Sequence, residues 1–432
     1  MKAGIIADDL TGANDTGVQF ARNGLRTYVS MSGEEPTRSD IDVLVVDTDS
    51  RGLSSKEAYL KVKQASELMK KIRPELIYKK LDSTLRGNVG AELEAVYDSF
   101  QPDFVIVAPG YPKNNRTVED GILCIGGKPL AETEFSFDPK TPVKESSIAG
   151  LIRNETGKEV GSMTKQDLNG GKERVIKKMK EYHQKGIHIL VFDSYTEEDL
   201  QLIVKYVRES AYQVIWSGSA GLANYMIDGV ESKAAYDTRI GKAESPVLMV
   251  VGSVNQQSRR QLERVMMDPT VKGIKLYSHK VLERETAGRE KERVLKAAAE
   301  AIDEKYHIVL YSSGNSEEVK LAQEAGAALG LTQSMVSERI SETLGQLTAD
   351  IVDNHRIDRL FLSGGDTAKK ACFAMGITEF KLLDEVEIGI PIGKLVHQKE
   401  IVMVTKAGGF GSASSLLDSL TILRGDKEIC AQ

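Results

Sequence analysis

Acidic, hydroxyl and cationic side chains follow the apolar runs in the first half of this 432-residue chain. The four groups are Asp8-Asp9-Leu10-Thr11-Gly12, Asp47-Thr48-Asp49-Ser50-Arg51, Lys80-Leu81-Asp82-Ser83-Thr84-Leu85-Arg86-Gly87 and Pro109-Gly110-Tyr111-Pro112-Lys113-Asn114-Asn115-Arg116. Carboxylates accept hydrogen bonds from hydroxyl groups, and long cations pair with carboxylates. The mixture suits a small polyhydroxylated acid, with helix caps and solvated loops as the alternative for any single group.

The corresponding turns of the second half are nearly neutral and rich in glycine and serine. They are Gly252-Ser253-Val254-Asn255-Gln256-Gln257-Ser258, Ser312-Ser313-Gly314-Asn315, Ser363-Gly364-Gly365-Asp366-Thr367 and Lys406-Ala407-Gly408-Gly409-Phe410-Gly411-Ser412. Glycine lets the backbone approach a ligand, and free N–H groups at a helix start hold anions such as phosphate. A tight turn explains most single glycines, and no Walker A motif occurs. An acid-binding half beside a phosphate-binding half indicates a phosphotransferase.

Short apolar runs that alternate with helical patterns must position these groups. The expected strands are Gly4–Ala7, Asp42–Val46, Leu76–Lys79, Phe104–Ala108, Ile187–Phe192, Gln213–Trp216, Val247–Val251, Gly273–Tyr277, Ile308–Tyr311, Arg359–Leu362 and Ile401–Thr405. Uninterrupted apolar runs are typical of strands buried on both faces of a parallel sheet. The alternation predicts two doubly wound α/β domains with mostly parallel sheets and a ligand cleft between them.

The expected domains are residues 1–230 for the acid and residues 245–432 for the nucleotide. The polar segment Asp228–Ser245 has no apolar periodicity and is expected to be the linker. Residues Gly110–Lys172 lack clear strand–helix alternation, and they are expected to form an excursion from the first sheet, with a small β-rich flap.

Composition narrows the class of protein. Lys plus Arg is 57 and Asp plus Glu is 63, so the net charge of −6 argues against a nucleic-acid partner. The three cysteines, Cys124, Cys372 and Cys430, form no CxxC pair, which suits a reducing cytoplasm. No apolar run is long enough for a membrane span, and no membrane partner is expected. A homo-oligomer is left open.

Six segments resemble the motifs of the four-carbon acid sugar kinase family. They are Asp8-Asp9-Leu10-Thr11-Gly12-Ala13-Asn14-Asp15-Thr16-Gly17, Asp47-Thr48-Asp49-Ser50-Arg51, Lys80-Leu81-Asp82-Ser83-Thr84-Leu85-Arg86-Gly87-Asn88, Ala108-Pro109-Gly110-Tyr111-Pro112, Ser363-Gly364-Gly365-Asp366-Thr367 and Lys406-Ala407-Gly408-Gly409-Phe410-Gly411. They follow the family order over essentially the whole chain. The resemblance implies an ATP-dependent kinase that phosphorylates the C4 hydroxyl of threonate, erythronate or 3-oxo-tetronate. It also implies an N-terminal sugar-acid domain and a C-terminal nucleotide domain.

With that reaction in view, Asp9 is the first candidate to orient, and to deprotonate, the substrate hydroxyl, and a helix cap is its alternative role. Strand alternation predicts that the side chains of Asp8 and Asp9 point apart. Three cations are candidates for the substrate carboxylate: Arg51, Lys80 and Arg86. Three further residues are expected to bind its hydroxyls: Asp82, Ser83 and Thr84.

In the second half, the glycine turns would hold ATP. The expected nucleotide contacts are Ser253, Asn255, Ser258, Ser363, Gly364, Gly365, Asp366, Thr367, Gly408 and Gly409. Asp366 could hold Mg²⁺, or it could be the base in place of Asp9. Lys406 is available for phosphate charge, and an N-cap is the alternative role for Ser258.

Two other functions stay open at this point. One is a kinase for another short hydroxy acid or oxo acid. The other is a two-domain sugar-acid-binding protein without catalysis, which would need neither Asp366 nor the glycine turns. The segment Asn14-Asp15-Thr16-Gly17-Val18-Gln19 resembles the threonate/erythronate branch of the family, without separating these two acids.

Overall fold

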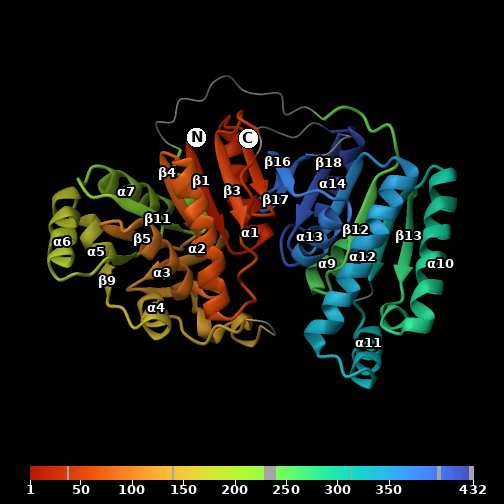
Figure 1. Ribbon diagram of the computed structural model, residues 1–432, viewed down its shortest axis with the longest axis horizontal. Helices are drawn as coiled ribbons and strands as arrows, with labels where there is room; N and C mark the ends of the chain where they lie inside the picture. Colours follow the sequence, from red (N-terminus) through yellow and green to blue (C-terminus); the bar gives the residue numbers. More distant parts are fainter. Residues whose placement is uncertain (37, 139–140, 228–239, 313, 397–399, 428–432) are drawn as a thin grey trace. The chain divides into compact units, whose positions relative to one another are not determined.

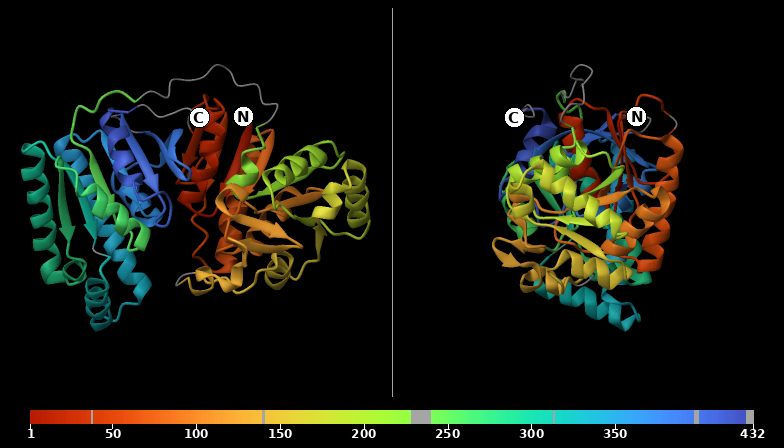
Figure 2. Two further views of the ribbon diagram at one scale, coloured as in Figure 1. Left: turned by 180° about the vertical axis from the view of Figure 1, so that it is seen from behind. Right: turned by 90° about the vertical axis from the view of Figure 1, so that its left-hand side faces the viewer.

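The computed structural model describes residues 1–36, 38–138, 141–227, 240–312, 314–396 and 400–427 (Figures 1 and 2). The chain divides into two compact units, Met1–Ala235 and Tyr236–Gln432. The expected linker falls at this division, and residues 228–239 of it lie outside the described residues. Within the described ranges, no helix is both long and apolar enough to cross a membrane.

The first unit is built on a parallel sheet in which every neighbouring pair of strands runs the same way. In spatial order its strands are β2 (Thr27–Ser30), β3 (Val43–Asp47), β1 (Ala3–Ala7), β4 (Leu76–Lys80), β11 (Val214–Gly218), β5 (Phe104–Ala108), β10 (Ile189–Phe192) and β9 (Val160–Met163). The chain first builds on one side of β1 and then on the other, so a topological switch point lies beside β1. The predicted doubly wound α/β class is confirmed.

Helices cover both faces of this sheet. One layer packs in the order α2 (Ser55–Ile72), α3 (Val89–Phe100) and α4 (Ile148–Thr156). The other contains α1 (Leu10–Arg22), α8 (Ala220–Ala223), α7 (Glu197–Arg208), α6 (Lys172–Gln184) and α5 (Lys165–Asn169). The sequence of α2 explains its place, because a Ser54–Glu57 capping box starts it and Ala58, Val62 and Met69 are buried along one face.

The excursion after β5 contains the expected small β element. Its antiparallel strands are β6 (Arg116–Glu119), β7 (Ile122–Ile125) and β8 (Lys128–Pro129). The excursion is shorter than predicted, because β9 at Val160–Met163 already belongs to the main sheet. Glycine and serine in the middle of β9 weaken the apolar signal that marks the other strands.

The second unit has a mixed sheet. In spatial order its strands are β13 (Val271–Leu276), β14 (His307–Ser312), β12 (Leu248–Val251), β15 (Arg359–Ser363), β18 (Ile401–Lys406), β17 (Ile390–Leu395) and β16 (Glu379–Glu387). The pairs from β13 to β18 are parallel, whereas β17 pairs antiparallel with both of its neighbours. The switch point of this unit lies between β12 and β15, where the chain changes its direction of growth.

Two helical layers also cover the second sheet. One contains α10 (Arg284–Asp303), α11 (Ser316–Ala328), α12 (Gln333–His355) and α13 (Gly365–Ala374). The other contains α9 (Gln256–Val265) and α14 (Ser415–Arg424), which pack on each other. Short 3-10 helices complete the connections: η1 (Pro112–Asn114), η2 (Leu130–Glu132), η3 (Glu134–Phe137) and η4 (Ser278–Val281).

Candidate active site

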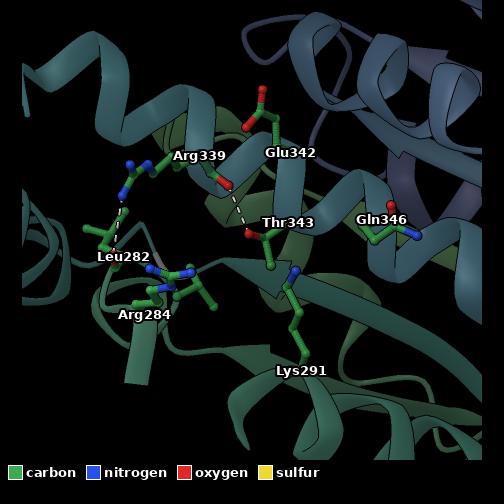
Figure 3. A pocket seen from close by; sticks show the side chains of 8 residues that line it. Leu282, Arg284, Lys291, Arg339, Glu342, Thr343 and Gln346 are labelled. Atoms are coloured by element: carbon green, nitrogen blue, oxygen red, sulfur yellow. Dashed lines mark hydrogen bonds between the residues drawn. The ribbon is translucent and has the colours of Figure 1, made fainter. Parts of the chain in front are cut away.

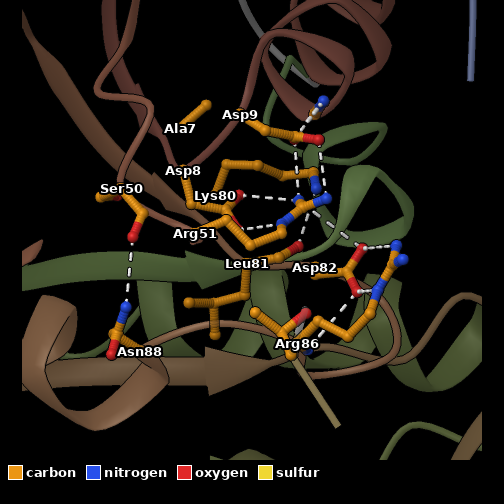
Figure 4. Close-up of polar contacts among 12 residues, drawn as sticks. Ala7, Asp8, Asp9, Ser50, Arg51, Lys80, Leu81, Asp82, Arg86 and Asn88 are labelled. Carbon is orange, nitrogen blue, oxygen red and sulfur yellow. Dashed lines mark hydrogen bonds and ion pairs between the residues drawn. The ribbon is translucent and has the colours of Figure 1, made fainter. Parts of the chain in front are cut away.

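The carboxylates of Asp8 and Asp9 meet at one guanidinium group, that of Arg51 (Figure 4). Arg51 donates to Asp8 through Nε at 2.7 Å and to Asp9 through Nη1 at 2.6 Å. The prediction that the two acids point apart is therefore wrong. Because β1 ends at Ala7, Asp9 no longer follows the strand and is the N-cap of α1, accepting from the Gly12 N–H at 2.7 Å. Asp9 thus has the alternative role of a cap in addition to its ion pair.

The turn after β4 adds a third carboxylate, Asp82, to the same cluster. Asp82 accepts from Arg86 Nε at 2.8 Å and lies 3.7 Å from Arg51 Nη2. Thr84 Oγ1 donates to Asp82 and accepts from Arg86 at 3.1 Å, so the Thr84 hydroxyl is already engaged. Ser83 lies half-buried in the same turn. Figure 4 shows Arg51 and Arg86 on opposite sides of the Asp82 carboxylate.

Lys80 differs from Arg51 and Arg86, which are both paired with carboxylates. The residue is only 3% exposed, and its ammonium donates to the Leu81 carbonyl at 2.8 Å. In the part of the chain that the structure describes, Lys80 forms no ion pair. Its Nζ lies 3.0 Å from the position that a Cβ would take on Gly12, so Gly12 leaves room for it beside the start of α1. The adjacent Lys79 is instead paired with buried Glu92 at 2.7 Å.

The three carboxylates of the cluster differ in the direction of their pKa shifts. Burial tends to raise the pKa of Asp8, but Arg51 outweighs it and the pKa is lowered. For Asp82, burial is likewise outweighed, here by Arg86 and Arg51, and the pKa is well below its usual range. For Asp9, burial exceeds the effect of Arg51 and the pKa is raised. Asp9 also has the most exposed side chain, 23% against 4% for Asp8 and 11% for Asp82.

A cavity of about 320 Å³ opens beside this cluster. Arg51 and Gly87 line it, together with Asn88 and with Thr141 and Lys144 from the excursion. A Cβ on Gly87 would lie 3.1 Å from Arg51 Cγ, and Gly87 has a positive φ of 96°, so glycine is needed there on both counts.

In the second unit, three glycine turns converge at the switch point between β12 and β15. A Cβ on Gly252 would meet Thr367 Oγ1 at 2.2 Å, and a Cβ on Gly408 would meet Ser253 Oγ at 2.4 Å. Gly364 has a φ of 104°, and its N–H donates to the Lys406 carbonyl at 2.9 Å. These three closely packed turns, the glycine cradle, lie at the start of α13. Glycine-rich turns at the start of a helix can bind anions through backbone N–H groups.

The side chains expected to contact the nucleotide have different positions around this surface. Asn255 is the N-cap of α9, and its amide nitrogen lies 3.9 Å from the Cβ position of Gly409. Ser258 is not a cap but a buried residue within α9, where its hydroxyl donates to the Gly408 carbonyl at 2.6 Å. The buried Ser363 hydroxyl has no hydrogen-bond partner in the described chain. Gly365 and exposed Asp366 lie in the first turn of α13.

The Lys406 ammonium donates hydrogen bonds to the glycine loop that follows β18, residues 406–411. Its ammonium donates to the carbonyls of Ala407, Gly408 and Phe410 at 2.8, 2.9 and 3.1 Å. Burial lowers the pKa of Lys406 to about 7. The prediction that Lys406 is available for phosphate is therefore wrong in this structure, because its donors organise the loop.

A second cavity in this unit, of about 450 Å³, lies among η4, α10 and α12 (Figure 3). Three cations line it: Arg284, Lys291 and Arg339. Arg339 donates to the Leu282 carbonyl at 3.4 Å, and none of the three forms an ion pair within the described ranges. One acid, Glu342, also lines the cavity, so cations outnumber acids among its lining residues three to one. Such an excess of positive charge favours anionic ligands.

Two residues near the acidic cluster, buried Asp15 and half-buried Arg116, were given no role by the sequence. Asp15 lies on α1, one turn beyond Gly12, and Arg116 is the first residue of β6. The signal available was that Arg116 ends one of the polar groups that follow strands, and that Asp15 belongs to the first family motif. Periodicity alone could not distinguish them from ordinary core and loop residues.

Comparisons with known proteins agree with the two-site geometry. The model of a sugar-binding N-terminal domain matches residues 3–226, and that of a nucleotide-binding C-terminal domain matches residues 248–416. A D-threonate kinase of Salmonella typhimurium is 34% identical, over 97% of this chain and 98% of its own. A D-erythronate kinase of Heliobacterium modesticaldum is 31% identical over 95% and 94%. A 3-oxo-tetronate kinase of Pseudomonas savastanoi pv. phaseolicola is 24% identical over 98% and 97%.

Solved structures share the fold. A crystal structure of a Haemophilus influenzae protein aligns with a TM-score of 0.76 and 23% identity, over 97% of this chain and all of that one. A two-domain α/β protein of this type, with a polar site at one switch point and a glycine cradle at the other, is a sugar-binding and nucleotide-binding protein. The chain belongs to the four-carbon acid sugar kinase family, as its motifs suggested.

Proposed function

We propose that this protein is an ATP-dependent kinase that phosphorylates the terminal 4-hydroxyl of a four-carbon sugar acid, with D-threonate and D-erythronate as the first candidates. One observation carries the proposal. At the switch point of the first unit, the partly exposed carboxylate of Asp9, whose pKa is raised, lies near the buried ammonium of Lys80, which forms no ion pair in the described chain. The glycine cradle lies at the switch point of the second unit. The full-length relatives named D-threonate kinase and D-erythronate kinase support this substrate class.

Asp9 is the residue we assign to the reacting hydroxyl. It orients the C4 hydroxyl and accepts its proton while the oxygen bonds to the γ-phosphorus. The bond from that phosphorus to the β,γ-bridging oxygen breaks, and ADP leaves. Phosphoryl transfer depends mainly on positioning and charge, so a base contributes modestly. Asp8 and Asp82, with lowered pKa values, stay ionised and hold Arg51 in place.

Among the three candidate cations, Lys80 is best placed to bind the substrate carboxylate. A buried ammonium with one carbonyl partner leaves two N–H donors for a ligand. Arg51 and Arg86 already contact carboxylates of the protein, and we assign them to the edge of the site. Asp82, Ser83 and Thr84 stay our candidates for the remaining hydroxyls.

In the second unit, the turns at Gly252-Ser253, Gly364-Gly365 and Gly408-Gly409 would hold the phosphates of ATP through backbone N–H groups. Asn255, Ser363 and Thr367 border the same surface. The exposed Asp366, in the first turn of a ten-residue helix, would hold Mg²⁺ directly or through water. Bound Mg²⁺ would shield phosphate charge. With Asp366 in that role, Asp9 remains our base.

The test is an ADP-release assay with Mg-ATP and a panel of D- and L-threonate, D- and L-erythronate, 3-oxo-tetronates and glycerate. We expect one four-carbon acid to be strongly preferred. Turnover of an acid outside this class would move the substrate to another hydroxy acid. Binding of an acid without ADP release would favour a non-catalytic binding protein and contradict the proposal.

A further inference from the structure

Asp15 is a buried carboxylate without the usual compensation. The residue is 8% exposed, and its Oδ1 atom has no hydrogen-bond partner in the described chain. It forms no ion pair there either. Burial raises the pKa of Asp15 to about 6. A buried polar group without partners costs stability, so its presence needs an explanation that the fold does not supply.

The position of Asp15 places it within the candidate site. Residues three apart on a helix share a face, so Asp15 lies on the same side of α1 as Gly12. The ammonium of Lys80 lies against Gly12, 3.0 Å from its Cβ position. Lys80, Asp9 and Arg116 each act electrostatically on the Asp15 carboxyl, after the larger effect of burial.

Arg116 has the complementary feature, a buried donor without an acceptor. Its Nε is buried and has no hydrogen-bond partner in the described chain, while Nη1 is held by the Asn114 carbonyl. Burial lowers the pKa of Arg116, and Asp82 and Asp15 oppose this effect. Asp15 and Arg116 are thus electrostatic neighbours that form no ion pair with each other. One offers an unused acceptor and the other an unused donor.

A hydroxyl group matches this pair, because it donates one hydrogen bond and accepts others. The C4 hydroxyl is already assigned to Asp9, and the carboxylate to Lys80. We propose that Asp15 and Arg116 together bind one secondary hydroxyl of the sugar acid, with Asp15 as acceptor and Arg116 as donor. This inference rests on the proposed function. If the bound hydroxyl is the one on C2, the carbon at which D-threonate and D-erythronate differ, the pair also discriminates between these two acids.

The test combines the Asp15→Asn variant with substrates that lack one hydroxyl and asks whether the two losses in kcat/KM are independent. Wild type and variant are assayed with the preferred acid and with its 2-deoxy and 3-deoxy analogues, both of which keep the C4 hydroxyl. In the wild type, loss of the contacted hydroxyl should lower kcat/KM by about 100-fold or more, since a site built for a hydroxyl rejects the analogue lacking it. In the variant, the same deletion should cost less than about 10-fold. If the sensitive analogue is the 2-deoxy acid, the ratio of kcat/KM for D-threonate and D-erythronate should fall by a similar factor.

The proposal would be overturned if Asp15→Asn lowered kcat/KM by the same factor for every acid, the deoxy analogues included. Arg116→Gln should show the same non-additivity with the same analogue, and it decides the matter if Asp15→Asn does not fold. Absence of ADP release from any four-carbon acid in the wild type would instead refute the proposed function. In that case the same crossing is carried out on binding of the acids by calorimetry.

Asp167→Asn is the matched control. Asp167 is also buried, but it accepts hydrogen bonds from Lys178, Thr164 and Arg174, which outweigh burial and lower its pKa to about 2. Its replacement should lower the melting temperature at neutral pH without altering the substrate ratios. Asp15→Asn should raise the melting temperature, because it removes an uncompensated buried charge. A lower melting temperature for Asp15→Asn with unchanged ratios would show a structural role and overturn the proposal.

Discussion

At the residue scale, three carboxylates share two guanidinium groups, yet their chemical roles differ. All three contact arginine, but the pKa values of Asp8 and Asp82 are lowered, whereas that of Asp9 is raised by burial and its side chain is the most exposed. A general base must be accessible and must have some affinity for a proton. Only Asp9 of the three meets both conditions.

We therefore expect Asp9→Asn to lower kcat by about 10²- to 10⁴-fold, because the variant loses both the positioning of the C4 hydroxyl and the acceptor of its proton. Nucleotide binding should be unchanged, because the glycine cradle belongs to the other unit. Steady-state kinetics and ATP titration of the variant measure both quantities. Asp8→Asn is the comparison: it should act chiefly through Arg51, with a smaller effect on kcat. Equal losses in the two variants would remove Asp9 from its special role.

The pH dependence of the same reaction has a definite sign. Asp9 accepts a proton only when it is ionised, so kcat/KM should fall as the pH falls through its pKa. Because burial raises that pKa, the acid limb should lie above the ordinary aspartate value of about 3.9. The limb should be absent in Asp9→Asn. A wild-type profile that is flat down to pH 4 would contradict this assignment.

The sequence predicted the membership of the acidic cluster better than its geometry. Asp9, Arg51, Lys80, Asp82 and Arg86 do lie at the ends of neighbouring strands, as parallel topology requires. Their pairing could not be predicted, because it depends on where β1 ends and α1 begins. A shift of one residue at that junction turns the Asp9 side chain towards Arg51 instead of away from it.

At the element scale, the glycine loop after β18 is shaped by side chains that point into it. Lys406 and Ser258 donate to the Gly408 carbonyl, and the Phe410 N–H donates to the Ala407 carbonyl. A Cβ at Gly408 would clash with the Ser253 hydroxyl in its present position. The loop is therefore held in one conformation before a ligand arrives, which lowers the entropic cost of binding.

We expect Gly408→Ala to weaken ATP binding by about 10-fold or more, equivalent to about 1.4 kcal/mol. Its Cβ would lie 2.4 Å from Ser253 Oγ, so the Ser253 hydroxyl or the loop must move. Calorimetric titration with ATP measures the effect, and sugar-acid binding serves as the internal reference. Gly288→Ala is the matched control, because Gly288 has open space around it on exposed α10. Unchanged ATP affinity in Gly408→Ala would show that the cradle is not the phosphate site.

The elements that sequence analysis missed share a physical cause. Apolar strands buried on both faces, such as β5 and β12, were predicted to within a residue or so. The antiparallel pair β16 and β17 was missed, and so were the short strands β2 and β9. β16 mixes apolar with charged residues along its length, and β2 has only four residues. Such strands owe their conformation to pairing with neighbours, which a single sequence does not display.

At the scale of the whole molecule, the chain separates two kinds of electrostatic environment. The switch point of the first unit concentrates opposite charges, and that of the second is formed by neutral backbone. Each suits one reactant: a hydroxy acid needs side-chain donors and acceptors, and a polyphosphate needs N–H groups. The domain limits at residues 1–230 and 245–432, and a ligand cleft between them, stay predictions.

Hydrogen exchange on the intact chain would test whether the sugar acid binds the first unit and the nucleotide binds the second. With a four-carbon acid present, amides should gain protection at the ends of β1, β3 and β4, in residues 8–16, 50–52 and 80–87. With Mg-ATP present, protection should appear in residues 252–258, 364–367 and 406–411, because ligand contact suppresses local opening. Deuterium uptake by mass spectrometry, with each ligand added alone, distinguishes the two sets. Protection by Mg-ATP of the first set without the second would contradict the assignment, because it would place the nucleotide among the carboxylates, where its phosphates would meet repulsion from Asp8, Asp9 and Asp82.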